Sequence, residues 1–290
     1  MVLKPKTMEE HRDYLYKIVR LKLFFMHGWL AGHPEESFGD VLRKRVDIYR
    51  KVDANPGALN PTAIDWNAPA WLELEQALIK VYEQNRGSGA RFEEEGFAVL
   101  RPSLDARLER DYLDRSGLQG YQCGSLRYNV YDEPTKEVGF HIANAVSPES
   151  IFDDPLYLPC CFMILMDQVE VRYQAEYIQT GTWLNSHSKW LELFPQEWHA
   201  NLSAPDTNVQ WHYGFWGQFI TARGTFNDKL GDYLRANGKL RYGLRSSKCT
   251  LAAMRRHLKA KFFAAEESRR QGRVVEINQG GYCCVGTKLQ

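Results

Sequence analysis

Residues 125–146 read SLRYNVYDEPTKEVGFHIANAV, and this stretch decides the predicted fold. Alternating apolar and polar residues flank the segment 133–136, whose proline, threonine and charged residues are typical of a turn. The stretch therefore predicts a β-hairpin. With Pro134 and Thr135 at the centre of the turn, His141 is expected to lie opposite Tyr128.

Downstream of the hairpin, helical and extended patterns alternate. Asp153 and Asp154 carry carboxylates of the kind favoured at a helix N-terminus, so a helix is expected from there to about Arg172. The elements expected next are a strand at 175–184, a helix at about 186–194, a strand at 209–220, helices at 226–237 and 250–270, and an extended tail at 273–286.

Upstream of the hairpin, residues up to about 91 are expected to be nearly all helical. Thr7 and Glu10 have the spacing of a capping box, and Pro69 stands near the first turn of a later helix. The period changes at Gly96, where residues 96–102 predict a short strand followed by another helix. The predicted regions are a helical N-terminal region at 1–95, an α+β core at 96–222, and a helical C-terminal extension with a terminal strand at 223–290.

The composition indicates a globular protein. The chain has 290 residues, of which 44% are hydrophobic and 13% aromatic. Its 37 basic and 36 acidic residues leave a formal charge of +1, which provides no overall field to attract nucleic acid or an anionic membrane. The basic helix at 250–270 is interrupted by acidic residues and is interpreted as a solvated face. A small-molecule substrate is therefore the expected partner, with no nucleic acid and no membrane.

The cysteines and the N-terminus favour a cytoplasmic protein. The six cysteines include no C-x-x-C pair, so reduced thiols are expected. The first residues lack the apolar segment of a secretory signal, and the apolar run at 156–166 is too short to span a bilayer. The helical first ninety residues are expected either to cover one face of the sheet or to form a homodimer surface.

The order of elements over residues 96–219 resembles the acetyltransferase fold of the GNAT superfamily. FAVLRPSLDARLERDYL (97–113) is similar to the opening strand and helix of that family, and VGFHIANAVSPES (138–150) to its fourth strand. TWLNSHSKWLELF (182–194) resembles its fifth strand and the following helix. The resemblance covers less than half of the chain. It implies a mixed, mostly antiparallel sheet and acyl transfer to an amine.

One part of the chain departs from the family pattern. The family binds the pyrophosphate of coenzyme A with a glycine-rich turn at a helix N-terminus. Here the corresponding residues, 147–155, read SPESIFDDP. They contain no glycine, and Glu149, Asp153 and Asp154 would repel phosphate. Acyl-CoA is therefore disfavoured as the cofactor, and the identity of the acyl donor stays open.

Two residues are the candidates for catalysis. His141 lies on the second hairpin strand beside the small residues Gly139 and Ala143, which leave room for a ligand around the imidazole. It is expected to act as a base or a substrate anchor, although a half-buried histidine bonded to a tyrosine needs no substrate. Tyr213 corresponds by the resemblance to a general acid that protonates a leaving thiolate.

The candidate substrate-binding residues are polar or aromatic. Asn144 and Asn185 would stand near the ends of neighbouring strands, where each could contact a substrate or cap a turn. Aromatic side chains with polar tips line small-molecule pockets and also fill thick cores. The aromatic candidates are Tyr128, Trp183, Trp211 and Trp216.

Two alternatives to acyl transfer remain open. In the first, His141 and His212 bind a metal together with Glu149 or Glu170, although no pair of histidines has the close spacing of a metal motif. In the second, the chain is a non-catalytic ligand-binding or interaction protein on a degenerate acyltransferase scaffold. The sequence predicts no metal site of its own.

Overall fold

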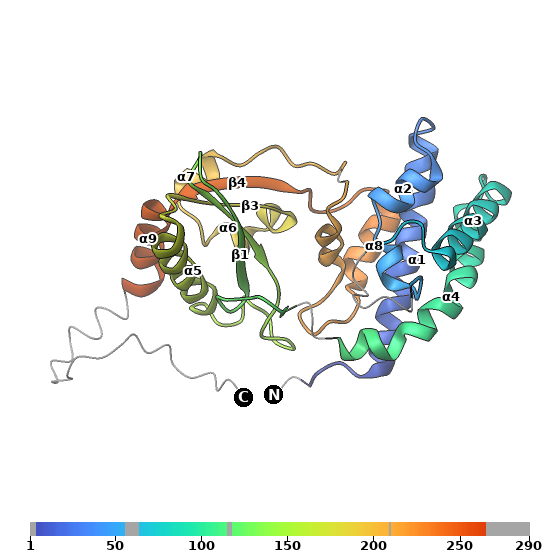
Figure 1. Cartoon of the computed structure of the whole chain (residues 1–290), viewed down its shortest axis with the longest axis horizontal. Coiled ribbons are helices and arrows are strands. Elements are labelled where there is room, and N and C mark those ends of the chain that lie inside the picture. The colour runs from blue at the N-terminus through green and yellow to red at the C-terminus, as the bar shows by residue number, and fades with distance from the viewer. Residues whose placement is uncertain (1–3, 56–63, 115–117, 209, 265–290) are drawn as a thin grey trace.

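The computed structural model describes residues 4–55, 64–114, 118–208 and 210–264. These residues form an α+β protein with a helical unit and a sheet unit, which lie next to each other (Figure 1). Each unit has its own hydrophobic core, and Trp183 packs against both cores. The expected α+β class is therefore confirmed.

The helical unit contains most of the N-terminal half of the chain together with a later segment. Its elements are α1 (Met8–Gly32), α2 (Phe38–Lys44), the 3-10 helix η1 (Ile48–Lys51), α3 (Pro69–Gln84), α4 (Gly89–Leu113), the 3-10 helix η4 (Tyr213–Phe219) and α8 (Asp228–Asn237). Its core includes residues from α1, α4, η4 and α8. The N-terminal helices therefore bury their apolar faces against each other and against a returning segment.

The sheet unit follows α4 in the chain and is completed after α8. Its elements are β1 (Leu126–Asp132), β2 (Glu137–Ile142), α5 (Tyr157–Tyr173), β3 (Tyr177–Thr182), the 3-10 helix η3 (Trp183–Ser186), α6 (Ser188–Leu191), α7 (Gln196–Ala200), β4 (Arg245–Thr250), α9 (Leu251–Leu258) and the π-helical turn η5 (Lys259–Phe263). The helices α5 and α9 lie together on one side of the sheet (Figure 1).

The four strands form one mixed sheet in the order β1-β2-β3-β4. The β1–β2 and β3–β4 pairs are antiparallel, and the β2–β3 pair, which α5 connects, is parallel. The predicted hairpin, the helix after it and the strand at 175–184 are confirmed as β1–β2, α5 and β3. The strand β4 was not predicted.

The hairpin register differs from the expectation by one residue. Asp132 pairs with Glu137, as a turn centred on Pro134 and Thr135 requires. An irregularity between Tyr128 and Tyr131 then shifts the pairing, so His141 lies opposite Arg127 and not opposite Tyr128. A bulge places two residues of one strand opposite one residue of its partner, which accounts for the shift.

Two predicted strands are wrong because helical packing prevails there. Residues 96–102 belong to α4, where Phe92, Phe97, Leu100 and Leu104 recur at helical spacing and are buried. The predicted strand at 209–220 contains the 3-10 helix η4, which buries Phe215, Trp216 and Phe219 in the core of the helical unit; residue 209 is outside the described residues. The tail at 273–286 and the end of the helix at 250–270 also lie outside them.

One face of the sheet is covered and the other is open. Val138, Phe140 and Ile178 point into the core beneath α5. Alternate residues point the opposite way because successive side chains along a strand emerge on opposite faces. The open face carries Arg127 on β1, Gly139 and His141 on β2, Gln179 and Gly181 on β3, and Ser246 and Lys248 on β4.

Candidate functional site

The strands β2 and β3 diverge beside His141. Their parallel pairing runs from Glu137 and Tyr177 to Gly139 and Gln179 and then stops, although β2 continues to Ile142 and β3 to Thr182. At that point the Thr180 hydroxyl donates a 2.8 Å hydrogen bond to the main-chain carbonyl of Phe140. A side chain therefore supplies the partner that the neighbouring strand would give in a continuous ladder.

His141 stands on the open face at this divergence. Its side chain is exposed, and its cross-strand neighbour is Arg127. Partial burial, the positive charge of Arg127 and the nearby His212 lower the pKa of His141 from its ordinary value of 6.5. An imidazole with a lowered pKa is mostly neutral at pH 7, so it can accept a proton.

Arg127 adds a hydrogen-bond donor next to this imidazole. Its guanidinium lies over the ring of Tyr121, 5.4 Å from the ring centroid. The Nε–H group of Arg127 is buried and has no hydrogen-bond partner among the described residues. A positive group with an unused donor can stabilise negative charge that develops on a bound molecule.

The centre of the open face has little side-chain bulk. Gly139 and Gly181 have no side chain. The exposed Gln179 lies on β3, where it pairs with Gly139 of β2. An added Cβ at Gly181 would lie 3.0 Å from the Ser246 hydroxyl, so a larger residue would crowd β4. At the far end, Lys248 and Glu137 form a 2.5 Å ion pair. The face thus provides a polar surface with His141 at one end.

The histidine pair does not complete a metal centre. His212, which precedes η4, is close enough for its charge to affect the pKa of His141. However, the described part of the chain contains no group of three or more His, Cys, Asp or Glu side chains that could hold a metal ion. Glu170, an expected ligand, pairs with Arg255 at 2.6 Å. The two imidazoles therefore lack a third ligand there.

In the loop before α5, acidic side chains accept hydrogen bonds from main-chain N–H groups of the same loop. Asp153 accepts a hydrogen bond from the Ser150 N–H at 2.9 Å, and Asp154 accepts one from the Leu156 N–H at 2.8 Å. The Asp153 N–H in turn donates to the Ser150 carbonyl. Because acidic side chains occupy these two donors, the Ser150 and Leu156 N–H groups are not open to a phosphate, and the charge of the loop is unfavourable for one.

The two candidate asparagines hold main-chain segments together. Asn185 is fully buried; its amide donates to the carbonyls of Thr180 and Arg245, and its oxygen accepts from Trp190. The Asn144 amide donates to the carbonyls of Glu149 and Ala222, and its oxygen accepts from the Val146 N–H. These contacts use both amide N–H groups of each residue within the fold.

Tyr213 and Trp216 attach η4 to the end of α2. The Tyr213 hydroxyl donates to the Arg43 carbonyl at 2.5 Å, and the Trp216 indole donates to the Arg45 carbonyl at 2.8 Å. Burial raises the pKa of Tyr213, since it disfavours the charged phenolate. The polar tips of both residues are therefore engaged in the helical unit.

The other aromatic candidates are dispersed. Tyr128 is buried on the covered face, where its ring packs against Tyr173. Trp183 stands between the two cores next to Tyr242. Trp211 is 55% exposed and lies near Trp66. Of the eight residues predicted for the site, only His141 has its side chain on the open face.

Sequence reasoning missed a network of buried charges in the helical unit. His11 and Lys22 lie on the buried stripe of α1, at the same spacing as the apolar residues Leu15 and Ile18. Charged residues are rarely buried without a partner. Titratable residues at the apolar positions of a helix therefore indicate buried partners elsewhere in the chain, and this was the signal available in the sequence. Their partners are Asp111 for His11 and Asp47 for Lys22.

The fold and the site thus define an α+β protein whose mixed sheet presents an open polar face beside diverging parallel strands. No protein-family model, no curated protein and no solved structure matches this chain.

Proposed function

We propose that the chain is an enzyme that transfers an acyl group to an amine on the open face of its sheet. The observation that carries this proposal is the divergence of β2 and β3 next to His141. Diverging parallel strands open a gap beside His141 in which an extended ligand with amide groups can lie. The Phe140 and Thr180 carbonyls at this gap are bonded to the Thr180 hydroxyl and the Asn185 amide, so the ligand is held by other polar groups of the two strands. The amide-containing arm of an acyl thioester is a ligand of that shape.

His141 is the base in this proposal. Its lowered pKa keeps the imidazole neutral near pH 7, so it can remove a proton from the amine as nitrogen attacks the thioester carbonyl. The C–N bond forms, the C–S bond breaks, and the proton held by His141 passes to the leaving thiolate. The positive charge of Arg127, the cross-strand neighbour of His141, stabilises the negative charge that develops on the carbonyl oxygen.

The loop before α5 limits which acyl donor fits. The Ser150 and Leu156 N–H groups are bonded to the carboxylates of Asp153 and Asp154, whose charges also repel a nucleotide diphosphate. The proposed donor is therefore recognised by its thioester and amide arm. Tyr213 has no part in the reaction, because its hydroxyl is bound to the Arg43 carbonyl.

Thermal unfolding with defined donors tests this proposal. A ligand that binds the native state raises its melting temperature. S-acetyl-N-acetylcysteamine, which has the arm without the nucleotide, and acetyl-CoA should both raise the melting temperature with similar apparent affinity. The non-thioester analogue with a methylene in place of sulfur should do the same, since it keeps the arm.

The matched variants are His141→Gln and His199→Gln. His199 is an exposed histidine on α7 and serves as the control. The control should acetylate a panel of primary amines at the rate of the unchanged protein, whereas His141→Gln should not. If no thioester raises the melting temperature, the acyl-transfer proposal fails. A folded protein that binds none of the donors would favour a non-catalytic role.

A further inference from the structure

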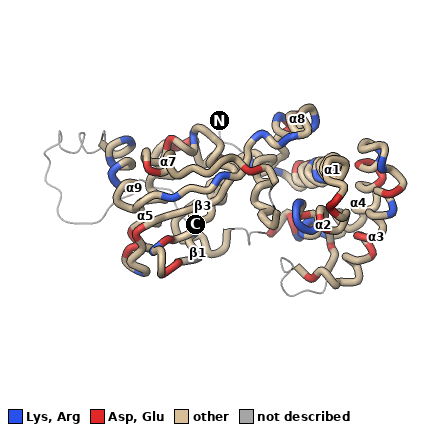
Figure 2. Tube along the Cα trace, turned by 90° about the horizontal axis from the view of Figure 1, so that it is seen from above, with Lys and Arg blue, Asp and Glu red and all other residues tan. Residues whose placement is uncertain are grey.

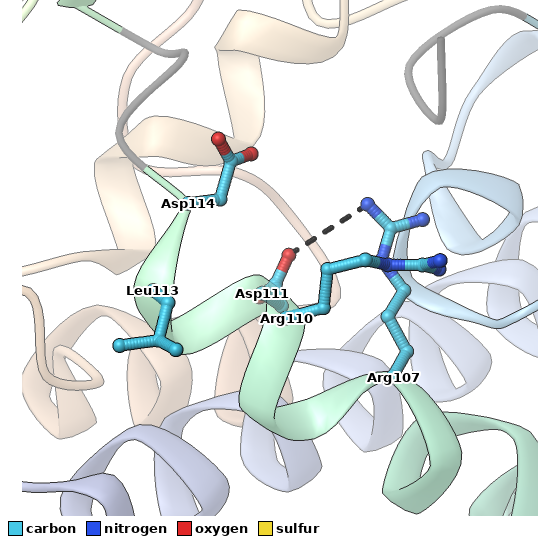
Figure 3. A pocket seen from close by; sticks show the side chains of 5 residues that line it. All are labelled: Arg107, Arg110, Asp111, Leu113 and Asp114. Atoms are coloured by element: carbon cyan, nitrogen blue, oxygen red, sulfur yellow. Dashed lines mark ion pairs between the residues drawn. The ribbon is translucent and has the colours of Figure 1, made fainter. Parts of the chain in front are cut away.

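A cavity lies in the helical unit, at the C-terminal end of α4. Its volume is about 310 Å³, and it is lined by Arg107, Arg110, Asp111, Leu113 and Asp114. Figure 3 shows the two guanidinium groups close together on one side and Asp114 on the other. The cavity is large enough for a small molecule, and four of its five lining residues are charged.

Neighbouring groups offset the negative charge of the Asp111 carboxylate. Asp111 accepts a 3.0 Å hydrogen bond from His11, and Arg107 approaches it at 3.9 Å (Figure 3). Burial alone would raise the pKa of Asp111, but His11, Lys51 and Arg107 outweigh it and hold that pKa well below its usual range. Asp111 therefore stays charged, and its negative charge is opposed by several positive groups.

Two buried nitrogen atoms near Asp111 have no hydrogen-bond partner among the described residues. Arg107 is 7% exposed, and its Nε–H has no partner among the described residues. Its Nη1 group makes a 3.4 Å contact with the Val52 carbonyl. The Nδ1 atom of His11, which is 3% exposed, also has no partner in the described structure. Buried polar groups are normally hydrogen-bonded, so the Arg107 guanidinium, which lines the cavity, can donate to one more partner, whereas His11 does not line the cavity.

Two guanidinium groups and two carboxylates line the cavity, and of these carboxylates Asp111 is offset by His11, Lys51 and Arg107. Asp53 accepts a 2.6 Å bond from Arg110, which leaves other N–H groups of this guanidinium at the cavity wall. Lys51 is near enough to Asp111 to lower the pKa of that carboxyl group. Burial alone would lower the pKa of Lys51, but Tyr14, Asp111 and Asp47 outweigh it and raise that pKa, so Lys51 remains protonated. Arginine forks are suited to binding oxyanions through two parallel hydrogen bonds.

We propose that this cavity binds the carboxylate or phosphate group of a small molecule, held by Arg107 and Arg110. The site is a recess next to the carboxylates of Asp111 and Asp114, so it suits a small oxyanion better than a polyanionic chain. It is separate from the open face of the sheet. The binding of an oxyanion here therefore does not depend on acyl transfer, and the two can fail independently.

Thermal unfolding of the full chain at constant ionic strength tests the site with chloride, acetate, succinate and inorganic phosphate. At least one oxyanion should raise the melting temperature in a saturable manner, and chloride should not. Comparing acetate and succinate with phosphate shows whether the site prefers a carboxylate or a phosphate group. Equal effects of chloride and of every oxyanion would overturn the proposal.

Two arginine variants make the test specific. Arg110→Gln removes a cavity residue whose side chain is 44% exposed and pairs with Asp53 at 2.6 Å. Arg235→Gln is the matched control, since Arg235 is 38% exposed and pairs with Glu93 at 2.7 Å, away from the cavity. Losing a charged hydrogen bond should weaken oxyanion binding about tenfold in Arg110→Gln. Binding should be unchanged in Arg235→Gln.

The unchanged protein offers a direct readout that needs no substitution at a buried position. The Nε–H cross-peak of Arg107 in a nitrogen–proton NMR spectrum should shift with oxyanion concentration and saturate with the same affinity as the thermal effect. A cross-peak that does not move while the protein is stabilised would place the oxyanion elsewhere and overturn the assignment.

Discussion

The Thr180 hydroxyl donates a 2.8 Å hydrogen bond to the Phe140 carbonyl at the point where the main-chain pairing of β2 and β3 ends. A β-branched side chain thus fixes the start of the divergence. Both residues are buried, so the bond is shielded from water. The divergence is a built feature of the sheet and not a frayed strand end.

Replacing Thr180 tests the role of this bond. Thr180→Val keeps the shape of the side chain but leaves the Phe140 carbonyl without a donor, which should lower the free energy of unfolding by about 1–3 kcal/mol. Thr180→Ser keeps the hydroxyl and should lose less. Urea unfolding measures both values. If the valine variant is as stable as the serine variant, the hydroxyl does not hold the divergence.

The pKa of His141 should be lower than that of a free histidine because of its surroundings. Because partial burial and the charge of Arg127 lower its pKa, its NMR titration midpoint should lie below 6.5. Arg127→Gln removes one of these causes and should raise the midpoint. The folded chain binds this proton less readily than the unfolded chain, so the contribution of His141 to stability is lost as the pH falls below 6.5 through the folded pKa. A midpoint above 6.5 would contradict the assignment of His141 as a neutral base.

Asn185 should matter for stability and not for ligand binding. Asn185→Ala removes three internal hydrogen bonds and leaves the buried Trp190 indole and the carbonyls of Thr180 and Arg245 without this partner. The free energy of unfolding should fall by about 2–4 kcal/mol. The affinity for a thioester, measured by calorimetry below the unfolding transition, should stay within a factor of about 3. A selective loss of affinity in a stable variant would instead support a role in substrate binding.

The buried pair of Lys22 and Asp47 should be sensitive to removal of one partner. Lys22 is 1% exposed, and Asp47 is its ion-pair partner. Asp47→Asn leaves a buried ammonium without a counter-charge and should destabilise the protein by about 3–5 kcal/mol in chemical denaturation. The control is Asp228→Asn, which removes an exposed partner of Lys17 and should cost at most about 1 kcal/mol. Equal effects of the two substitutions would show that Lys22 is already compensated elsewhere.

Local signals in the sequence predicted several elements correctly. The capping box of Thr7 and Glu10 is present at the start of α1, and the turn at 133–136 closes the hairpin as expected. These features depend on residues close together in the chain. The bulge that places His141 opposite Arg127 was not predicted, because the residues of the turn set the register only near Asp132 and Glu137, and the shift occurs farther along β1, between Tyr128 and Tyr131.

The wrong predictions have a common physical cause. The predicted strands at 96–102 and 209–220 contain aromatic and branched residues that favour strands in isolation, yet residues 96–102 belong to α4 and residues 213–219 to the 3-10 helix η4, and both pack into the core of the helical unit. The polar strand β4 has little apolar pattern and forms because it pairs with β3 along its whole length. Figure 2 shows basic and acidic residues interspersed over both units, so net charge alone gave no signal for the buried network.

The rate of acetyl transfer from S-acetyl-N-acetylcysteamine to primary amines tests the central claim most directly. General base catalysis typically contributes about 100-fold to 10,000-fold in rate, so kcat/KM should fall by at least about 100-fold in His141→Gln. It should be unchanged in His199→Gln. The absence of any transfer by the unchanged protein, or equal rates for the two histidine variants, would contradict the assignment of His141 and the open face as an acyl-transfer site.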